Sequence, residues 1–201
     1  ETYGEDPYLT ARLGVRYVEG MQGKDPNYLK VAACAKHFAV HSGPEELRHE
    51  FDARVTQQDL YETYLPAFQS LVQEAGVESI MGAYNRVNGE PCNGSKTLLK
   101  DILRDKWGFE RHVVTDCWAI KDFYEGHHVT SGPIDSVALA VSAGCDVNCG
   151  TLFVYLIQAV EEGLISEDKI TQACVRLFTT RMKLGIFDDN KQVPFNEISY
   201  D

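Results

Sequence analysis

The chain has 201 residues, of which 44% are hydrophobic, and this suits one ordinary globular domain or part of a larger one. Its formal net charge is -11. Because phosphate binding needs clustered Lys and Arg, we expect neither nucleic acid nor an anionic membrane surface as a partner. No apolar run approaches the ~20 residues that would span a bilayer. A neutral or cationic small substrate fits this charge better.

The chain begins without an initiator Met and without a basic-then-apolar leader. Residues 1–7 read as the middle of a loop. We therefore expect either that processing removed a segment or that the chain is a fragment. The compartment cannot be read from such a beginning.

The first half of the chain alternates helix and strand. A helix is predicted over residues 6–22, with Pro7 at its first position and Gly23 after its end. A strand over residues 31–35 follows, and its small, unbroken apolar residues are typical of a strand buried on both faces. Residues 39–53 read as a long charged loop, and loops of that length inside a compact domain are often functional.

The middle of the chain continues this alternation. Thr56 is predicted to cap a second helix, which runs to residue 75, and Pro66 should kink or split it. A strand over residues 77–82, a helix over residues 95–106 and a strand over residues 111–115 come next. Polar residues follow each strand.

The last part of the chain adds three helices, over residues 133–143, 151–162 and 166–184. Residues 144–150 are predicted to form a short strand and its turn. The segment from residue 188 to 201 is polar and is predicted to be a tail or the start of an interdomain linker.

Three helices carry apolar residues at helical spacing, which we predict to be their buried stripes. These residues are Leu9, Leu13, Tyr17, Val18 and Met21 in the first helix, Leu60, Tyr64, Phe68, Leu71, Val72 and Ala75 in the second, and Ile170, Cys174, Leu177, Phe178 and Met182 in the last.

Strands and helices thus alternate about four times, which predicts an α/β fold with parallel strands and helical crossovers. The polar residues after each strand would gather at one face, as at the carboxyl ends of a (β/α)8 barrel. A full barrel has eight such units in ~250 residues. We therefore predict a partial TIM-type barrel over residues 1–187. The earlier units should lie before Glu1, because a half barrel would leave two unpaired edges.

The six cysteines are scattered, and several lie in apolar strand-like contexts, which favours buried free thiols over a disulfide framework. They are Cys34, Cys92, Cys117, Cys145, Cys149 and Cys174. The Cys145-x-x-x-Cys149 spacing has no second pair that would indicate zinc. Adjacent His127 and His128 do not share a face and are read as loop. We predict no metal and no cofactor.

Asp116 is the strongest candidate for chemistry. It ends the β-branched run of residues 112–115, and α/β folds keep their catalytic groups where an apolar strand ends. We predict that it is a catalytic nucleophile. An N-cap or an ion-pair partner remains the alternative, as for most Asp residues at strand ends.

Several short motifs occur in an order and spacing that resemble family 3 glycoside hydrolases, which are exo-acting β-glucosidases and β-xylosidases. The motifs are Glu1 to Leu9, Lys36-His37-Phe38-Ala39, Met81-Gly82-Ala83-Tyr84-Asn85, Leu103-Arg104 with Lys106-Trp107-Gly108-Phe109, and Val113-Val114-Thr115-Asp116. Each motif is weak alone, but the ordered set is specific, and it covers nearly the whole chain.

The resemblance implies roles for particular residues. Asp116 matches the catalytic nucleophile, and Lys36 with His37 matches the pair that hydrogen-bonds the terminal sugar. Tyr84 matches a Tyr close to the nucleophile, and Glu45 resembles a residue that contacts sugar hydroxyls. The resemblance also implies a TIM-type barrel followed by an α/β sandwich domain, which usually donates the acid/base Glu. Without the resemblance, Lys36 would be read as a surface residue and His37 as a core residue.

Retaining glycosidases need two carboxyls about 5–5.5 Å apart, one to attack and one to protonate the leaving group. Lys36 is expected to supply a positive charge, and Tyr84 a hydroxyl, that favour an ionised Asp116. The matching acid/base Glu and the upstream sugar-gripping residues fall outside this chain. We therefore predict that the isolated chain is inactive.

Trp118 is predicted either to be a platform under a sugar ring or to be a core residue.

The sequence favours one of two candidate substrates, a terminal xylosyl or a terminal glucosyl residue, only slightly. Cys117 directly follows Asp116, where many β-glucosidases of the family carry Trp, and this favours terminal β-D-xylosyl over β-D-glucosyl residues of an oligosaccharide. The alternative function is a non-catalytic carbohydrate-binding relative that uses the same pocket. A phosphate-binding α/β protein is disfavoured because no Gly-rich phosphate loop is present. The habit of the family suggests a secreted or periplasmic protein.

Overall fold

The computed structural model describes residues 3–199. Glu1 and Thr2 of the N-terminal motif, and Tyr200 and Asp201 of the predicted tail, lie outside the described residues. Among residues 3–199, the structure contains no helix with the length and apolar character needed to cross a membrane.

The strands are β1 (Cys34–Phe38), β2 (Asp52–Ala53), β3 (Ser79–Gly82), β4 (Arg86–Val87), β5 (Glu90–Pro91) and β6 (His112–Thr115). The α-helices are α1 (Pro7–Gln22), α2 (Gln57–Asp59), α3 (Pro66–Gln73), α4 (Asp122–Glu125), α5 (Pro133–Ala143), α6 (Leu156–Glu161) and α7 (Glu167–Lys183). Two segments have the wider π-helical winding, η2 (Leu60–Tyr64) and η4 (Lys96–Lys106). Short 3-10 turns are η1 (Glu45–Leu47), η3 (Cys92–Gly94), η5 (Leu152–Tyr155), η6 (Asn190–Gln192) and η7 (Pro194–Glu197).

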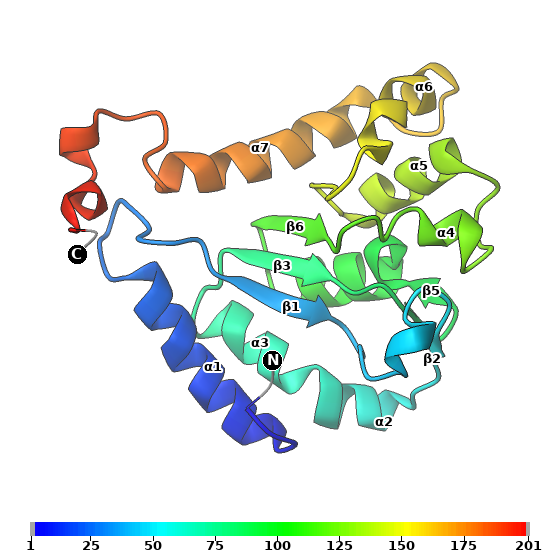
Figure 1. The fold of residues 1–201 in the computed structure, drawn as a ribbon, viewed down its shortest axis with the longest axis horizontal. Coiled ribbons are helices and arrows are strands. Elements are labelled where there is room, and N and C mark those ends of the chain that lie inside the picture. The colour runs from blue at the N-terminus through cyan, green and yellow to red at the C-terminus, as the bar shows by residue number, and fades with distance from the viewer. Residues whose placement is uncertain (1–2, 200–201) are drawn as a thin grey trace.

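The main sheet has the order β1-β3-β6, and all three strands are parallel (Figure 1). Ile80 of β3 pairs with Ala35 on one side and with Val113 on the other. A single bridge from Val114 to Val147 extends this sheet beyond β6. The predicted α/β class with a parallel sheet is therefore confirmed. Closure of this sheet into a barrel stays a prediction.

The carboxyl ends of the three strands point to the same side of the molecule, where α4 and a smaller sheet lie (Figure 1). In that smaller sheet β2 runs parallel to β4, and β4 runs antiparallel to β5. The polar residues that follow the main strands therefore lie next to one another, as expected for parallel strands.

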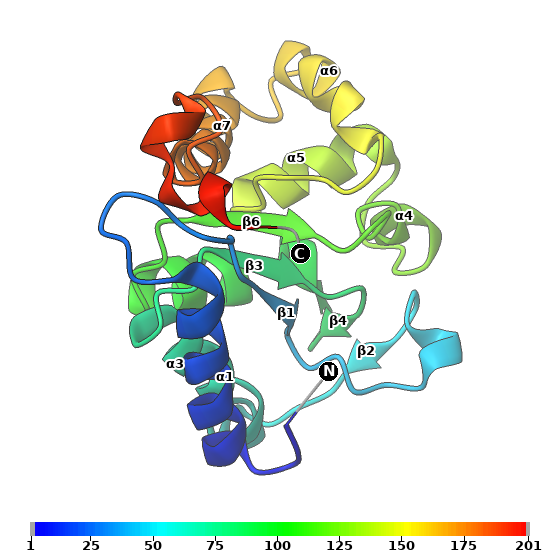
Figure 2. The same cartoon turned by 60° about the vertical axis from the view of Figure 1, so that its left-hand side comes forward.

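Helices flank the main sheet at both of its edges. Both views show α1 and α3 beside β1, and α5, α6 and α7 beyond β6 (Figures 1 and 2). The core between the sheet and these helices contains fully buried side chains from each main strand, including Phe38, Ile80 and Val113. Burial of these apolar groups is the main favourable term that holds the sheet together.

The boundaries of two predicted strands were wrong. β1 begins at Cys34 rather than Val31, so Lys36 and His37 lie within the strand and not after it. Pairing with β3 decides this, because the ladder runs from Cys34 to Phe38. Residues 144–150 contribute only the bridge at Val147, not a strand of their own.

Two predicted buried stripes were only partly right. In α1 the predicted Val18 is buried, but Tyr17 is 61% exposed, and the buried face also contains Gly14, which was not predicted. Gly14 faces Leu71 of α3, where a Cβ atom would lie 3.1 Å from Leu71 Cδ2. Small residues let the two helices approach closely, and this outweighs the spacing of the larger apolar residues.

The last helix shows the same effect. The buried residues of α7 are Ala173 and Thr180, whereas Cys174, Phe178 and Met182 are exposed. Of the predicted stripe, Ile170 and Leu177 are half-buried, and Ile170 packs against the core, so the stripe of α7 was predicted only in part.

The predicted cap and break of the second helix are confirmed. Thr56 Oγ1 accepts a hydrogen bond from the backbone N–H of Asp59 at 3.0 Å. The segment then winds as η2 and resumes as α3 at Pro66. Proline cannot donate the hydrogen bond that a continuous helix needs, so the winding changes there.

Two buried carboxylates tie α7 to the beginning of β6. Glu78 lies 3.0 Å from Arg111 Nε and 3.1 Å from Lys183 Nζ. Asp146 lies 2.8 Å from both Arg104 and Arg176, and it accepts the backbone N–H of Val113 at 2.8 Å. These ion pairs lie at the opposite end of the sheet from Asp116.

The segment after α7 folds back onto the molecule. Val193, between η6 and η7, is buried, and a Cβ at Gly185 would lie 2.4 Å from its side chain. Phe195 packs beside Gly23 at the end of α1. The domain boundary at residue 187 and the linker role of residues 188–201 stay predictions.

Candidate active site

Asp116 lies one residue beyond β6 and is held by its own backbone neighbours. Its N–H donates to the carbonyl of Gly82 at 3.1 Å, which continues the β3–β6 ladder. The N–H of Cys117 donates to Asp116 Oδ1 at 2.8 Å. The Asp116 side chain remains 16% exposed. The carboxylate therefore has a fixed orientation and one oxygen, Oδ2, that is not engaged by this turn.

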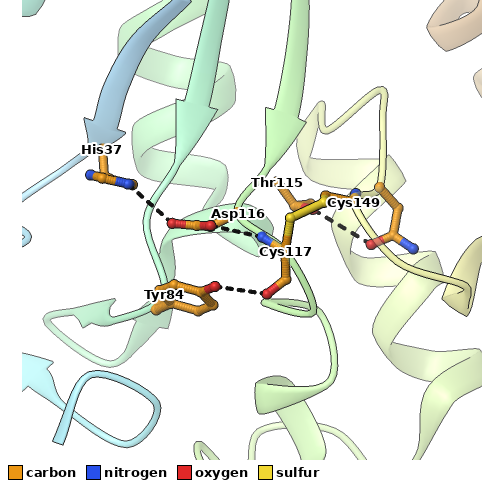
Figure 3. The surroundings of a disulfide bond; sticks show 7 residues. His37, Tyr84, Thr115, Asp116, Cys117 and Cys149 are labelled. Atoms are coloured by element: carbon orange, nitrogen blue, oxygen red, sulfur yellow. Dashed lines mark hydrogen bonds and ion pairs between the residues drawn. A yellow bond between two sulfur atoms is a disulfide. The ribbon is translucent and has the colours of Figure 1, made fainter. Parts of the chain in front are cut away.

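His37 of β1 reaches across the sheet to this second oxygen. Its Nε2 lies 3.1 Å from Asp116 Oδ2 (Figure 3). Lys36 precedes it on the same strand and is exposed. The peptide bond between Lys36 and His37 is cis, as is the one between Phe38 and Ala39. The structure thus brings His37 against Asp116 and places Lys36 next to His37.

Tyr84 lies two residues beyond β3 and approaches the same turn. Its hydroxyl donates to the carbonyl of Cys117 at 2.8 Å (Figure 3). Burial, together with the negative charge of Asp116 and a hydrogen bond to it, raises the pKa of Tyr84 to about 12. The phenol therefore keeps its proton at neutral pH and remains a hydrogen-bond donor beside Asp116.

A disulfide joins Cys117 to Cys149 beside the candidate nucleophile (Figure 3). The prediction of free thiols was therefore wrong for these two cysteines. The Val114–Val147 bridge brings the two segments together, and the sequence gives no sign of this pairing. Cys34 and Cys174 are free but exposed, whereas Cys92 and Cys145 are free and buried, as predicted.

Backbone hydrogen bonds reinforce the cross-link. The N–H of Trp118 donates to the carbonyl of Cys149 at 2.7 Å, and the N–H of Cys149 donates to Thr115 Oγ1 at 3.0 Å. Residues 115–118, which carry Asp116, are therefore fastened to residues 147–149 on both sides of the carboxylate.

Trp118 is not a core residue, because its side chain is 50% exposed. Its φ angle is +67°, and its ring lies over Gly150, where a Cβ would come within 3.4 Å of Trp118 Cε3. It borders a cavity of about 590 Å³ that His49 and Asp122 also line. Its use as a sugar platform stays a prediction.

Glu45 lies in η1. It forms an ion pair with Arg48, and its side chain is 74% exposed. Its role as a contact for sugar hydroxyls stays a prediction.

Three residues near Tyr84 were missed by sequence reasoning. The Arg48 guanidinium lies over the Tyr84 ring at 5.3 Å, and the His49 ring meets it edge-on at 4.7 Å. Asp122 Oδ2 lies 2.8 Å from His49 Nδ1. The charged composition of residues 39–53 signalled a functional loop, but nothing in the sequence indicated that Asp122 pairs with it. Among residues 3–199, no cluster of three or more side chains suited to a metal ion is present.

The fold and the site define an α/β protein with a carboxylate held at the carboxyl ends of parallel strands. Residues 1–180 match the family model described as "Glycosyl hydrolase family 3 N terminal domain". The chain belongs to this family.

Curated relatives cover the chain over its whole length. A xylan 1,4-beta-xylosidase from Xylanibacter ruminicola is 49% identical over 204 residues, which cover 100% of this chain and 24% of the relative. Beta-D-xylosidase 1 from Arabidopsis thaliana is 41% identical over 197 residues, which cover 94% of this chain and 25% of the relative. The chain thus spans about a quarter of the length of these relatives.

Solved structures agree with this assignment. A GH3 exo-beta-xylosidase in complex with a xylobiose aziridine activity-based probe superposes with a TM-score of 0.94 at 34% identity, covering 100% of this chain and 27% of that one. A beta-glucosidase from Listeria innocua in complex with isofagomine has a TM-score of 0.87 at 31% identity, covering 100% of this chain and 28% of that one.

Proposed function

We propose that this chain is part of a retaining, exo-acting β-glycosidase that removes terminal β-D-xylosyl residues from oligosaccharides, with Asp116 as the nucleophile. The observation that carries the proposal is the orientation of Asp116 at the end of β6. Its Oδ1 is held by the Cys117 N–H at 2.8 Å, and its Oδ2 lies on the side of His37 and the strand ends.

The chemistry follows from this orientation. Asp116 attacks the anomeric carbon, and the bond from that carbon to the leaving oxygen breaks as the oxygen takes a proton from a general acid. Water, deprotonated by the same acid/base group, then cleaves the glycosyl ester and restores the carboxylate. We place the acid/base Glu outside this chain. The half-buried phenol of Tyr84 donates its hydrogen bond to the carbonyl of Cys117, beside Asp116, and its O–H dipole favours the anionic form that attacks.

The terminal sugar is proposed to lie against β1 and the Asp116 turn. Lys36 and His37 would donate hydrogen bonds to its hydroxyls, since both lie on the strand next to β3. Trp118 would offer an aromatic face at the rim of the cavity. Glu45 would enter from the η1 loop, although it pairs with Arg48 in the sugar-free structure.

The choice of xylose over glucose rests on the relatives. Those from Xylanibacter ruminicola, Aspergillus fumigatus and Arabidopsis thaliana are all named as β-xylosidases. The β-glucosidase from Listeria innocua is less similar in sequence, at 31% identity. A β-D-glucosyl substrate remains the competing choice.

The parallel sheet is proposed to be part of a TIM-type barrel. Its strand order and its covering helices are consistent with consecutive β/α units. The remaining units and the acid/base domain would come from sequence outside this chain, which accounts for about a quarter of the length of its relatives.

A non-catalytic sugar-binding relative is the second candidate, since a fold alone does not fix activity. A pocket that only binds has no need for a carboxylate aimed at the anomeric carbon. The backbone hydrogen bond that orients Asp116 therefore favours the enzyme.

Covalent trapping tests the proposal. The full natural protein would be treated with an activated 2-deoxy-2-fluoro-β-xyloside and, in parallel, with the matching glucoside, and its peptides would be weighed after digestion. We expect the sugar on the peptide that contains Asp116, with faster labelling by the xyloside. Faster labelling by the glucoside would overturn the substrate choice.

An Asp116→Asn variant serves as the matched control, because it keeps the shape of the side chain and removes its charge. We expect it to lose at least about a thousandfold in turnover while still binding xylose. A folded protein that gives no adduct with either reagent would support the binding module instead.

A further inference from the structure

The Tyr84 ring is enclosed by a chain of polar side chains from the η1 loop and α4. Asp122 contacts His49, His49 contacts Arg48, and Arg48 forms an ion pair with Glu45. The rings of Tyr84 and His49 are 4.7 Å apart at a steep angle, and the Arg48 guanidinium lies 5.3 Å from the Tyr84 ring centre. Two of the four side chains therefore touch the phenol that lies beside Asp116.

The hydrogen bonds of His49 define which nitrogen carries its proton. Arg48 Nε donates to His49 Nε2 at 3.1 Å, so this nitrogen must be the acceptor. The proton then lies on Nδ1, which donates to Asp122 Oδ2 at 2.8 Å. A carboxylate that holds a histidine in one tautomer in this way fixes both the rotation of the ring and the role of the far nitrogen.

The backbone that carries His49 is also fixed. Gly126, which follows α4, has no room for a Cβ, because the atom would lie 2.2 Å from the carbonyl oxygen of His49. Arg86 donates to the carbonyl of Glu50 at 2.8 Å and to that of His127 at 3.3 Å. The loop and α4 are therefore joined closely, and Asp122 itself is buried.

We propose that Asp122 and His49 are positioning residues for Tyr84, because Asp122 fixes the His49 tautomer, and His49 and Arg48 together hold the phenol hydroxyl at the Asp116–Cys117 turn. The inference rests on the proposed function and deepens it. Neither Asp122 nor His49 is assigned contact with the reacting atoms.

The hydroxyl needs such support because its own anchor is a single hydrogen bond of 2.8 Å, to the carbonyl of Cys117. A swing of the whole ring about the Cα–Cβ bond would withdraw this donor from the Asp116–Cys117 turn. Small displacements of groups around a reacting centre can cost about a hundredfold in rate. A cation over the ring face and an imidazole at its edge restrict that rotation from two directions.

Asp122→Asn is the informative variant. The uncharged amide holds the Nδ1–H tautomer less strongly than the carboxylate does, and whenever its NH2 group faces Nδ1 the proton moves to Nε2 and opposes the Arg48 Nε–H donor. We expect kcat on an aryl β-xyloside to fall about 10-fold to 100-fold, with KM changed by less than about twofold. Asp101→Asn, a matched change at an exposed ion pair with Lys96, should leave both constants unchanged.

A double-mutant cycle with Tyr84→Phe separates positioning from general structure. If Asp122 acts through the Tyr84 hydroxyl, Asp122→Asn should have almost no further effect once that hydroxyl is absent. An equal loss of kcat in both backgrounds would overturn the inference, and so would an Asp122→Asn enzyme with wild-type kcat.

Nitrogen NMR of histidine-labelled protein gives a readout that does not require activity. We expect His49 to be protonated on Nδ1 in the wild type and to gain Nε2–H tautomer in Asp122→Asn, with the His49→Gln variant used to assign its signals. An Nε2–H tautomer in the wild type would also overturn the inference. A wild-type protein with no turnover on any β-glycoside would instead refute the proposed function, while the tautomer would still be decided.

Discussion

His127 is the most deeply buried histidine of the described residues, and its burial makes the free energy of unfolding depend on pH. Neither of its ring nitrogens has a hydrogen-bond partner among residues 3–199, and its ring stacks on Phe123. Burial, with a smaller contribution from Arg86, lowers the pKa of His127 to about 4. The folded protein therefore holds His127 neutral where an unfolded chain, with a pKa near 6.5, would protonate it.

This makes the stability of the protein depend on pH in a defined window. Above about pH 6.5 His127 is neutral in both the folded and the unfolded state, so its titration does not change the free energy of unfolding there. As the pH falls from there to about 4, the unfolded state binds the proton first, and the free energy of unfolding drops by up to about 3 kcal/mol. Below pH 4 this group adds no further loss.

The His127→Leu variant tests this effect. Urea unfolding at pH 7 and at pH 4.5 should show a smaller difference between the two conditions in the variant than in the wild type. His128→Gln, at an exposed neighbour, should retain the wild-type difference. An unaltered pH dependence in His127→Leu would show that His127 is already solvated.

At the scale of elements, the disulfide fastens residues 115–118, which carry Asp116, to the segment after α5. We expect the Cys117→Ser, Cys149→Ser double variant to lose about 3 to 4 kcal/mol of unfolding free energy, because the bond closes a loop of 32 residues. Turnover should fall as well, since the cross-link holds the turn in which the backbone N–H of residue 117 orients Asp116.

The control for this double variant replaces a cysteine that forms no disulfide. Cys174→Ser on the exposed face of α7 should change neither stability nor turnover. Full activity in the double variant would mean that the hydrogen bonds of residues 115–118 hold the carboxylate without the cross-link.

The contact of α7 with β6 depends on Asp146. Its side chain is 1% exposed and compensates two guanidinium groups. Asp146→Ala would leave Arg104 and Arg176 without their counter-ion, and we expect a loss of about 3 to 5 kcal/mol, measured by chemical unfolding. Asp146→Asn should lose less, because it can still accept the Val113 N–H. Asp101→Ala, at an exposed pair, should cost at most about 1 kcal/mol. Equal losses in the two alanine variants would contradict this account.

The sequence predicted elements best where local chemistry decided them. The break at Pro66 and the Thr56 cap came from backbone hydrogen bonding, and the position of Asp116 came from the end of an apolar run. The buried faces of α1 and α7 were mispredicted because close packing favours small residues such as Gly14 and Ala173.

Contacts between segments that are far apart in the chain could not be predicted from the sequence. His49 and Asp122 are 73 residues apart, and their pairing depends on how the η1 loop folds over α4. The Cys117–Cys149 pair likewise depends on a single bridge at the edge of the sheet. Neither segment carries a local pattern that distinguishes a paired side chain from an exposed one.

At the scale of the whole molecule, our proposal assigns to this chain a carboxylate and sugar-contacting groups but no proton donor for the leaving group. We expect the purified 201-residue chain to hydrolyse aryl β-xylosides at no more than a trace of the rate of the full natural protein. Turnover would be measured with both proteins at equal concentration. Robust turnover by the chain alone would require an acid within these residues.

A substrate with a leaving group that needs no proton makes this comparison sharper. In 2,4-dinitrophenyl β-xyloside the aryl group departs as a stable phenolate without a proton. Any residual activity of Asp116 in the isolated chain should therefore appear first with this substrate. Equal rates with a poor leaving group would rule out the absence of a donor as the reason for inactivity.

The Cys117–Cys149 bond also bears on where this protein can mature. Cross-links of this kind form and persist in oxidising compartments and are rare where glutathione keeps thiols reduced. A newly made chain would carry two thiols beside Asp116 until it met an oxidant. Only then would the Cys117–Cys149 bond form and fasten the turn that carries Asp116. Production in a reducing cytosol should therefore yield folded molecules that still react with a thiol reagent at Cys117, and exposure to an oxidant should remove this reactivity.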